Sequence, residues 1–479
     1  MTAAPSVSYS ITVRLELPAG GAGVSALTTA VEQAGGLVTA LDVTASGHER
    51  LRMDVTCAAR DGDHAEAIVE VMRQVPGAVI GKVSDRTFLM HLGGKIAMES
   101  KHPIRNRDDL SMVYTPGVAR VCLAIAKNPE DARRLTVKRN SVAVITDGSA
   151  VLGLGNIGPK AALPVMEGKA ALFKRFADID AWPLCLDTQD TEEIIAVCKA
   201  LAPGFAGINL EDISAPRCFE IEARLREALD IPVFHDDQHG TAIVVLAALY
   251  NALRVVSKEI DQVRIVMAGA GAAGTAIMRL LVEAGVGHLI AVDIDGVVHR
   301  GRPDLGPSMQ WVADHTNPDN LTGTIHDVMA GADVFIGVSA PGVINADDVA
   351  AMSEDAIVFA LANPEPEIDP VEATRHAAVV ATGRSDFANQ INNVLAFPGV
   401  FRGLIDARTD QVTTPMLLAA ARALASVVTD TELNAAYIMP SVFHAEVHTI
   451  VAEAVRVAAG GAASEPGGGP GSGDGTSRA

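Results

Sequence analysis

The sequence is poor in aromatic residues, cysteine and positive charge, and each shortage excludes a class of protein. Aromatic residues make up 4% of the 479 residues and hydrophobic residues 49%, so the apolar content is mostly small and aliphatic, as in tightly packed α/β layers. The 38 Lys and Arg against 58 Asp and Glu leave a formal net charge of −20, which argues against a nucleic-acid or membrane-surface protein. An anionic substrate would therefore need a metal ion or a few well-placed cations.

The chain has five cysteines, and they stand singly at Cys57, Cys122, Cys185, Cys198 and Cys218. The absence of a C-x-x-C pair indicates a reduced, cytoplasmic protein without a disulfide framework. Residues 1–18 lack the basic and apolar regions of a secretory signal. No uninterrupted apolar run reaches the roughly 18 residues of a membrane span, and the nearest, Thr241–Val256, predicts a core helix instead.

The first ninety residues have a pattern of their own. Alternating polar and apolar residues predict strands at 8–17, 37–43, 50–57 and 78–83, and helical spacing predicts helices at 24–33 and 63–73. A Gly-rich turn at 18–23 follows the first strand. The order βαββαβ predicts a small ferredoxin-like sandwich. Its charges are scattered, and no catalytic cluster is apparent.

Two α/β regions follow, and their alternation of strands and helices predicts parallel, doubly wound sheets. In the first region, buried strands are expected at 141–146, 179–186, 206–210 and 231–235. In the second, strands are expected near 263–268, 288–293, 333–338, 357–361 and 378–382, with closing helices at 415–424 and 441–457. We therefore expect domains at 1–92, 93–245 and 246–459, and a flexible Gly-rich tail at 460–479.

A dinucleotide-binding fingerprint lies in the second region. The strand at 263–268 leads into Gly269-Ala-Gly271-Ala-Ala273-Gly274 and then a helix. The first glycine permits a tight turn, the second lets backbone amides approach a pyrophosphate, and the third lets the helix pack on the strand. Since strand, turn and helix occur in the required order, this turn, including Ala273, is predicted to bind a dinucleotide.

The acidic residue Asp293 ends the next strand, 19 residues after Gly274. A carboxylate there accepts hydrogen bonds from a ribose diol and repels a 2′-phosphate, so the sequence favours NAD over NADP. The cations His299, Arg300 and Arg302 follow closely enough to leave NADP as an alternative.

Acidic pairs follow two of the buried strands of the first region. Glu211-Asp212 follows the strand at 206–210, and Asp236-Asp237 follows the strand at 231–235. Open α/β sheets place their ligands at these carboxyl ends. Gathered carboxylates repel one another unless a cation lies between them, and oxygen donors select Mg²⁺ or Mn²⁺. The alternative is that each pair caps a helix or lies in a solvated turn.

Several longer motifs, spread over residues 95–455, resemble those of malic enzymes. They are Tyr114-Thr-Pro-Gly-Val-Ala119, Thr146-Asp-Gly-Ser-Ala-Val-Leu-Gly-Leu-Gly-Asn-Ile-Gly158, Pro164-Val-Met-Glu-Gly-Lys169, Asn209-Leu-Glu-Asp212, His235-Asp-Asp-Gln-His-Gly-Thr241, Asn363-Pro-Glu-Pro366 and Asn392-Asn-Val-Leu-Ala-Phe-Pro-Gly399. The resemblance, closest to the short bacterial branch, implies oxidation of L-malate with NAD(P)⁺ and decarboxylation to pyruvate and CO₂, with a divalent cation. It also implies a homodimer or homotetramer.

The resemblance also implies roles for individual residues. Lys169 matches the base for the 2-hydroxyl proton, and we expect burial to lower its pKa. Asp236 matches the neighbour that positions this lysine, and Tyr114 matches the acid that protonates C3 of enolpyruvate. The metal ligands would be Glu211, Asp212 and Asp237, and the amides of Asn363 and Asn393 would hold substrate, with Asn363 also near the nicotinamide. Lys160 is a competing candidate for the base, and Tyr114 is also consistent with a buried structural tyrosine.

Two departures from the family pattern are informative. The arginine that clamps a malate carboxylate in longer relatives is replaced by Ser149-Ala150. Residues 8–90 resemble an ACT domain, which implies a small-molecule effector, although a dimerisation segment without ligand fits almost as well. Two rival functions remain: a malolactic enzyme that retains NAD, and an inactive NAD-binding metabolite sensor.

Overall fold

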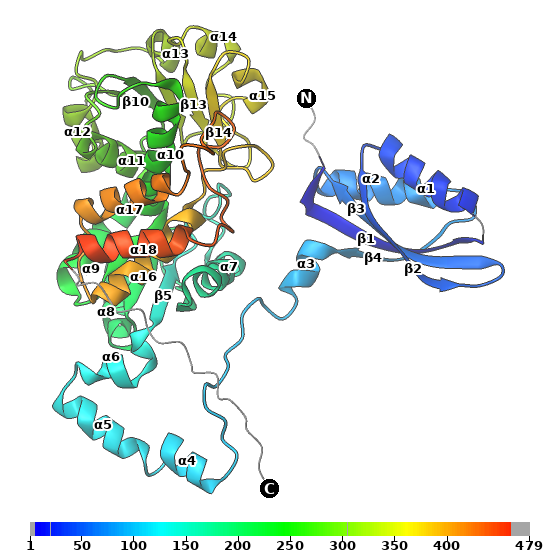
Figure 1. Cartoon of the computed structure of the whole chain (residues 1–479), viewed down its shortest axis with the longest axis horizontal. Helices are drawn as coiled ribbons and strands as arrows, with labels where there is room; N and C mark the ends of the chain where they lie inside the picture. Colours follow the sequence, from blue (N-terminus) through cyan, green and yellow to red (C-terminus); the bar gives the residue numbers. More distant parts are fainter. Residues whose placement is uncertain (1–4, 20, 304, 461–479) are drawn as a thin grey trace. The chain divides into compact units, whose positions relative to one another are not determined.

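The computed structural model describes residues 5–19, 21–303 and 305–460. It divides the chain into two compact units, residues 1–99 and 100–479, and each is described by itself (Figure 1). Apart from Gly460, the predicted tail lies outside the described residues.

The first unit contains the six predicted elements in the predicted order. They are β1 Ser6–Pro18, α1 Gly21–Gln33, β2 Leu37–Ser46, β3 Arg50–Ala59, α2 Gly62–Arg73 and β4 Val79–Asp85. The strands form an antiparallel sheet in the order β2-β3-β1-β4. Every second residue of β1, from Val13 to Leu17, is fully buried in a core shared with both helices, as the alternation predicts. The predicted turn at 18–23 is wrong at its end, because α1 begins at Gly21; a short helix, α3 Arg86–His91, was not predicted.

The second unit opens with three short helices and then forms its first parallel sheet. The helices are α4 Arg107–Val113, α5 Val118–Lys127 and α6 Asp131–Leu135. The sheet has the order β6-β5-β7-β8, with β5 Ser141–Thr146, β6 Asp180–Cys185, β7 Gly207–Leu210 and β8 Val233–His235. Its strands are connected through α7 Pro159–Ala177, α8 Thr191–Leu201 and α9 Arg217–Ala228. All four strands were predicted from their apolar runs, within two residues at each end.

The second sheet has the order β11-β10-β9-β12-β13-β14 and is parallel except for β11. Its strands are β9 Arg264–Ala268, β10 His288–Asp293, β11 Gly296–Val297, β12 Val334–Gly337, β13 Ile357–Ala360 and β14 Val379–Thr382. Its helices are α11 Ala272–Glu283, α12 Pro307–His315, α13 Ile325–Met329, α14 Ala346–Ala350 and α15 Pro370–Ala373. The strand order reverses beside β9, and ligands of doubly wound sheets bind at this point. The two-residue β11 is too short for its sequence to predict.

One hydrophobic core joins the two sheets. It contains residues of β5, β9 and the predicted core helix α10 Thr241–Val256, in which eleven side chains are buried. The closing helices α16 Phe397–Ala407, α17 Thr414–Ser426 and α18 Val447–Ala458 pack on it. The predicted helix at 441–457 is wrong over its first six residues, because the Ser441 hydroxyl accepts a hydrogen bond from Phe443 N, a local bond that competes with a helix.

Two stretches reach the hydropathy and length of a membrane span, residues 107–127 and 236–256. The second is 67% buried and is the core helix. The first is not buried at all, but it consists of α4 and α5, of seven and ten residues, which are each shorter than the roughly 20 residues of a spanning helix. Figure 1 shows this pair extending away from both sheets.

Candidate functional site

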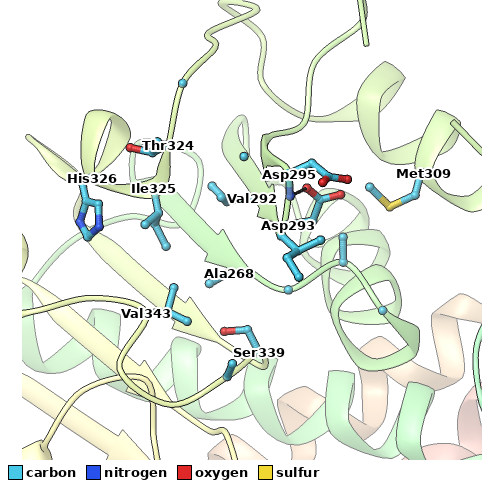
Figure 2. A pocket seen from close by; sticks show the side chains of 17 residues that line it. Ala268, Val292, Asp293, Asp295, Met309, Thr324, Ile325, His326, Ser339 and Val343 are labelled. Carbon is cyan, nitrogen blue, oxygen red and sulfur yellow. Dashed lines mark hydrogen bonds between the residues drawn. The ribbon is translucent and has the colours of Figure 1, made fainter. Parts of the chain in front are cut away.

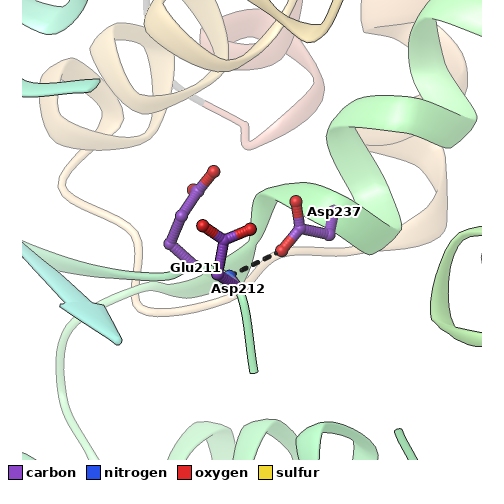
Figure 3. Close-up of side chains that lie close together, drawn as sticks. All are labelled: Glu211, Asp212 and Asp237. Carbon is purple, nitrogen blue, oxygen red and sulfur yellow. Dashed lines mark hydrogen bonds between the residues drawn. The ribbon is translucent and has the colours of Figure 1, made fainter. Parts of the chain in front are cut away.

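The acidic pairs meet at the carboxyl ends of β7 and β8. Glu211 and Asp212 follow β7 directly, and Asp237 lies in η3, a π-helical turn over Asp236–Gly240 that follows β8. One carboxylate oxygen from each of Glu211, Asp212 and Asp237 lies within 4.8 Å of the others (Figure 3). The backbone N–H of Asp212 donates to Asp237 Oδ2 at 2.8 Å and joins the two loops. The sequence prediction that these strand ends bring carboxylates together is confirmed.

The charge of this cluster is not balanced by the protein alone. Burial raises the pKa of Glu211 well above its usual value and that of Asp212 to about 8, and the neighbouring carboxylates add to both shifts. Among the described residues, the buried Asp212 Oδ2 has no hydrogen-bond partner. Three oxygen ligands with an unsatisfied oxygen fit a hard divalent cation, Mg²⁺ or Mn²⁺.

Lys169 projects into the same cluster from α7. Its Nζ lies 2.6 Å from Asp236 Oδ2 and 2.8 Å from Glu211 Oε1, and 4.2 Å from the centre of the Phe397 ring. Its side chain is only 10% exposed, whereas Lys160, the competing candidate, is exposed. The predicted direction of its pKa shift is wrong: burial does act to lower the pKa of Lys169, but the carboxylates of Asp236, Glu211 and Asp237 outweigh it and raise the pKa.

Asp236 is fully buried and holds two functional side chains at once. Its Oδ2 accepts a hydrogen bond from Lys169 and a second, at 3.2 Å, from Asn393 Nδ2. Asn393 is fixed in turn because its Oδ1 accepts from Thr241 Oγ1 at 3.2 Å. A Cβ at Gly240 would lie 1.8 Å from Asp236 Oδ1, so the close approach of this carboxylate requires glycine there.

The second sheet brings Asn363 to the loop that follows β5. A Cβ on Gly153, within the 146–158 motif, would lie 2.8 Å from the Asn363 backbone oxygen. The Asn363 side chain is exposed, and its Nδ2 donates one long bond, of 3.4 Å, to Leu361 O among the residues that the structure describes. Its amide is therefore available to a ligand.

Tyr114 is not brought to this group within the chain. It follows α4 directly and is 69% exposed, and no residue of α4 or α5 is buried. The chain passes from α5 through α6 to the amino end of β5, whereas the carboxylates lie beyond the carboxyl ends of β7 and β8, which run parallel to β5. The six residues of β5 span about 20 Å.

The structure adds residues that sequence reasoning did not single out. Arg217, at the start of α9, donates to Asp147 Oδ2 at 2.9 Å and to Ser149 Oγ at 3.0 Å, and so braces the loop after β5. Asn209 Nδ2 donates to Glu211 Oε2 at 2.7 Å and orients that carboxylate. Asn209 and Asp147 lie inside motifs already quoted, but nothing in their spacing connects Asp147 to Arg217.

The glycine fingerprint forms one wall of a pocket of about 770 Å³. Gly269 has φ of +103°, and its Cβ would lie 2.6 Å from Val338 O, while a Cβ on Gly274 would lie 2.0 Å from Gly269 O. Nothing lies within 4 Å of a Cβ on Gly271, so the backbone is open to a phosphate there. The helix α11 begins one residue before Ala273. These features fit the predicted dinucleotide.

Asp293, the acid predicted to bind the ribose, lies beside the glycine turn, because Gly269 N donates to Val292 O at 2.8 Å. Asp293 and Asp295 lie on one side of the pocket and His326 on the other (Figure 2). Among the described residues, the Asp293 side chain uses only Oδ1 in hydrogen bonds, with Asp295 N at 2.9 Å and Arg302 at 2.7 Å.

The comparisons with known proteins agree with this geometry. The family "Malic enzyme, N-terminal domain" matches residues 93–226, and "Malic enzyme, NAD binding domain" matches residues 238–460. An NAD-dependent malic enzyme of Geobacillus stearothermophilus is 57% identical over 452 residues, which cover 94% of this chain and 95% of that protein. A bifunctional malic/malolactic enzyme of Bacillus subtilis is 51% identical, over 76% of this chain and 90% of that protein.

Among solved structures, an NAD-dependent malic enzyme from Thermotoga maritima superposes with a TM-score of 0.75 at 48% identity. The match covers 78% of this chain and 99% of that structure. The two family descriptions together match most of the chain, and a relative 57% identical covers 94% of it, so the chain belongs to the malic enzyme family.

Proposed function

We propose that the protein oxidises L-malate with NAD⁺ and decarboxylates it to pyruvate and CO₂ in the cytoplasm. The observation that carries the proposal is the Lys169 amine, 2.6 Å from Asp236 and 2.8 Å from Glu211, beside a three-carboxylate cluster. A family match alone does not indicate that the residues needed for the reaction are present. The lysine amine and the three carboxylates that could hold a cation, found side by side, support that.

In this proposal, Lys169 accepts the proton of the malate 2-hydroxyl while hydride leaves C2 for the nicotinamide. The surrounding carboxylates keep the amine protonated, so it becomes a base only when their negative charge is balanced. A divalent cation held by Glu211, Asp212 and Asp237 would supply that balance, and Lewis-acid stabilisation of charge developing on the substrate. Asp236 then positions the amine through its hydrogen bond and stabilises the positive charge that the amine gains with the proton.

Tyr114 is proposed as the acid that protonates C3 of enolpyruvate, and we propose that it acts in the site of a second copy of the chain. In its own chain it belongs to the exposed α4–α5 pair, which precedes the amino end of β5, whereas Lys169 lies beside the carboxylates at the carboxyl ends of β7 and β8. The α4–α5 pair carries exposed apolar side chains, including Leu110, Met112 and Leu123, which would be buried against a partner. A homodimer that exchanges these segments would complete both sites.

Mixed dimers test this exchange. Lys169→Met should lose malate oxidation, and Tyr114→Phe should retain oxidation but lose proton exchange at C3 of pyruvate, so the mixed dimers are assayed by that exchange. Mixing them should restore about a quarter of the wild-type sites, because half of random dimers are mixed and each has one complete site. If mixing restores nothing although the subunits exchange, Tyr114 acts within its own chain or not at all.

A malolactic reaction is the second candidate, because the Bacillus subtilis relative is named a bifunctional malic/malolactic enzyme. The two outcomes differ in products. The proposed reaction releases NADH and pyruvate, whereas a malolactic reaction consumes malate and yields lactate without free NADH. A chain that binds NAD⁺ but converts malate neither to pyruvate nor to lactate would be the metabolite sensor.

We also propose that residues 1–92 form an ACT-like regulatory domain, ahead of a substrate and metal domain at 93–245 and a nucleotide domain at 246–459. The independent core of the first unit and its β2-β3-β1-β4 sheet support this. A panel of amino acids and small metabolites should shift the melting temperature and the malate saturation curve of the full chain. A chain beginning at residue 93 should lose both responses, and if no compound acts, the unit is structural.

A further inference from the structure

Arg302 is bound on both arms by acidic residues of the nucleotide pocket. Its Nη1 donates to Asp293 Oδ1 at 2.7 Å, and its Nη2 donates to Asp295 Oδ2 at 2.9 Å. The Arg302 and Asp293 side chains are 15% and 17% exposed, so this pair is held where water screens it poorly. The Asp295 backbone N–H donates to the same Asp293 Oδ1 and closes the network.

This network decides which oxygen of Asp293 faces a ligand. Because Oδ1 receives both bonds, Oδ2 has no partner among the described residues and remains for a ribose hydroxyl. The two acids also cancel the charge of the guanidinium. Hydrogen bonding to Asp293 raises the pKa of Arg302, consistent with a cation that is fully engaged.

The two other basic residues that follow this acid in the sequence, His299 and Arg300, do not contact it. Arg300 donates through Nη2 to the backbone oxygen of Pro318 at 2.9 Å, and the His299 ring accepts from Gly301 N at 3.2 Å. His326, on the opposite wall, is paired with Asp348 at 2.9 Å. Among these four residues, only Arg302 reaches the Asp293 carboxylate.

We propose that Arg302 determines the coenzyme class of this enzyme: paired with Asp293 and Asp295 it orients the acid that selects NAD, and without Asp293 it becomes a receptor for a 2′-phosphate. The proposal rests on NAD binding by the proposed function. Once Asp293 is removed, the planar guanidinium of Arg302 has N–H groups that can donate hydrogen bonds to phosphate oxygens. One residue would thus support selection of NAD in the native chain and of NADP in a single-site variant.

Coenzyme binding tests this without turnover. Dissociation constants of NADH and NADPH are measured by nicotinamide fluorescence, in EDTA and without malate, so that neither the cation nor catalysis contributes. Asp293→Ser should tighten NADPH binding by about tenfold to a hundredfold, the effect of one charge-assisted hydrogen-bonded contact, and weaken NADH binding. Arg302→Ala should weaken NADH several-fold without improving NADPH.

The double variant Asp293→Ser with Arg302→Ala is decisive. If Arg302 receives the phosphate, the NADPH gain disappears in the double variant but persists in the matched control, Asp293→Ser with Arg300→Ala. If the double variant keeps the gain, only repulsion by Asp293 was removed, and the proposal is wrong. Asp293→Ala repeats the test should the serine variant not fold. Failure of the native chain to bind NADH would instead contradict the proposed function.

Discussion

Replacing Gly240 with alanine should inactivate the enzyme without unfolding it. The backbone at Gly240 is α-helical, with φ of −62° and ψ of −46°, so alanine fits the main chain. Its Cβ, however, would lie 1.8 Å from Asp236 Oδ1, so the carboxylate has to move by about 1.5 Å to reach a normal contact. That shift breaks the 2.6 Å bond from Lys169 and the 3.2 Å bond from Asn393. A misplacement of about 1 Å can cost on the order of 100-fold in rate, and we expect a loss of at least this size in kcat.

The assay is steady-state NADH formation from L-malate with Mn²⁺, together with the melting temperature and NADH affinity. NADH affinity should not change, because Gly240 lies outside the nucleotide pocket. The matched control is Gly204→Ala, whose Cβ would meet nothing within 4 Å and which should behave as wild type. If Gly240→Ala retains kcat within twofold of wild type, Asp236 does not position Lys169 and the reasoning fails.

Three further predictions concern stability. Folding raises the pKa of Asp212 from 3.8 to about 8, so the folded chain favours the protonated carboxyl. In EDTA, ionisation of Asp212 should therefore lower the melting temperature as the pH rises from about 4 towards about 8. Mn²⁺ or Asp212→Asn should reduce this dependence on pH, and an unchanged dependence would contradict the prediction. Burial lowers the pKa of His448 to about 4, so its ionisation opposes the Asp212 effect and removes stability as the pH falls from 6.5 to 4. Relative to the native chain, His448→Gln should therefore gain stability over this interval, and a constant difference between the two chains would contradict this. Phe173→Ala should cost about 3–5 kcal/mol in urea unfolding, since the ring packs edge-on against Phe397 and Phe401 at 4.7 and 5.2 Å; a cost below about 1 kcal/mol would show that the core closes over the gap.

The fold could be predicted largely from local pattern. Strands such as β5 are short apolar runs bounded by turn residues, and every residue of β5 is buried in the parallel sheet, as that pattern requires. The carboxylate cluster followed from topology, because parallel strands bring their carboxyl ends together whatever lies between them in the sequence. The nucleotide turn followed from three glycines, of which Gly269 and Gly274 have a steric reason in the structure and Gly271 leaves the backbone open.

The features that were predicted wrongly or missed depend on contacts between residues that are distant in the sequence. The direction of the Lys169 pKa shift is set by carboxylates that lie 42 and 67 positions away in the sequence, at Glu211 and Asp236, and their combined effect appears only when packing brings them within 3 Å. Arg217 reaches Asp147 over 70 positions, and no motif records that pair. The exposure of Tyr114 could not be predicted from its motif, because a motif does not tell whether its tyrosine lies in the site of its own chain or of another copy.

The account's central claim is that the Lys169 and carboxylate site oxidises and decarboxylates malate with NAD⁺. The most direct measurement is the product stoichiometry of the purified full chain with Mn²⁺, L-malate and NAD⁺. The account predicts equal amounts of NADH, pyruvate and CO₂ for each malate consumed, and none of them from Lys169→Met. Lactate formed without NADH, or equal turnover by the Lys169 variant, would contradict it.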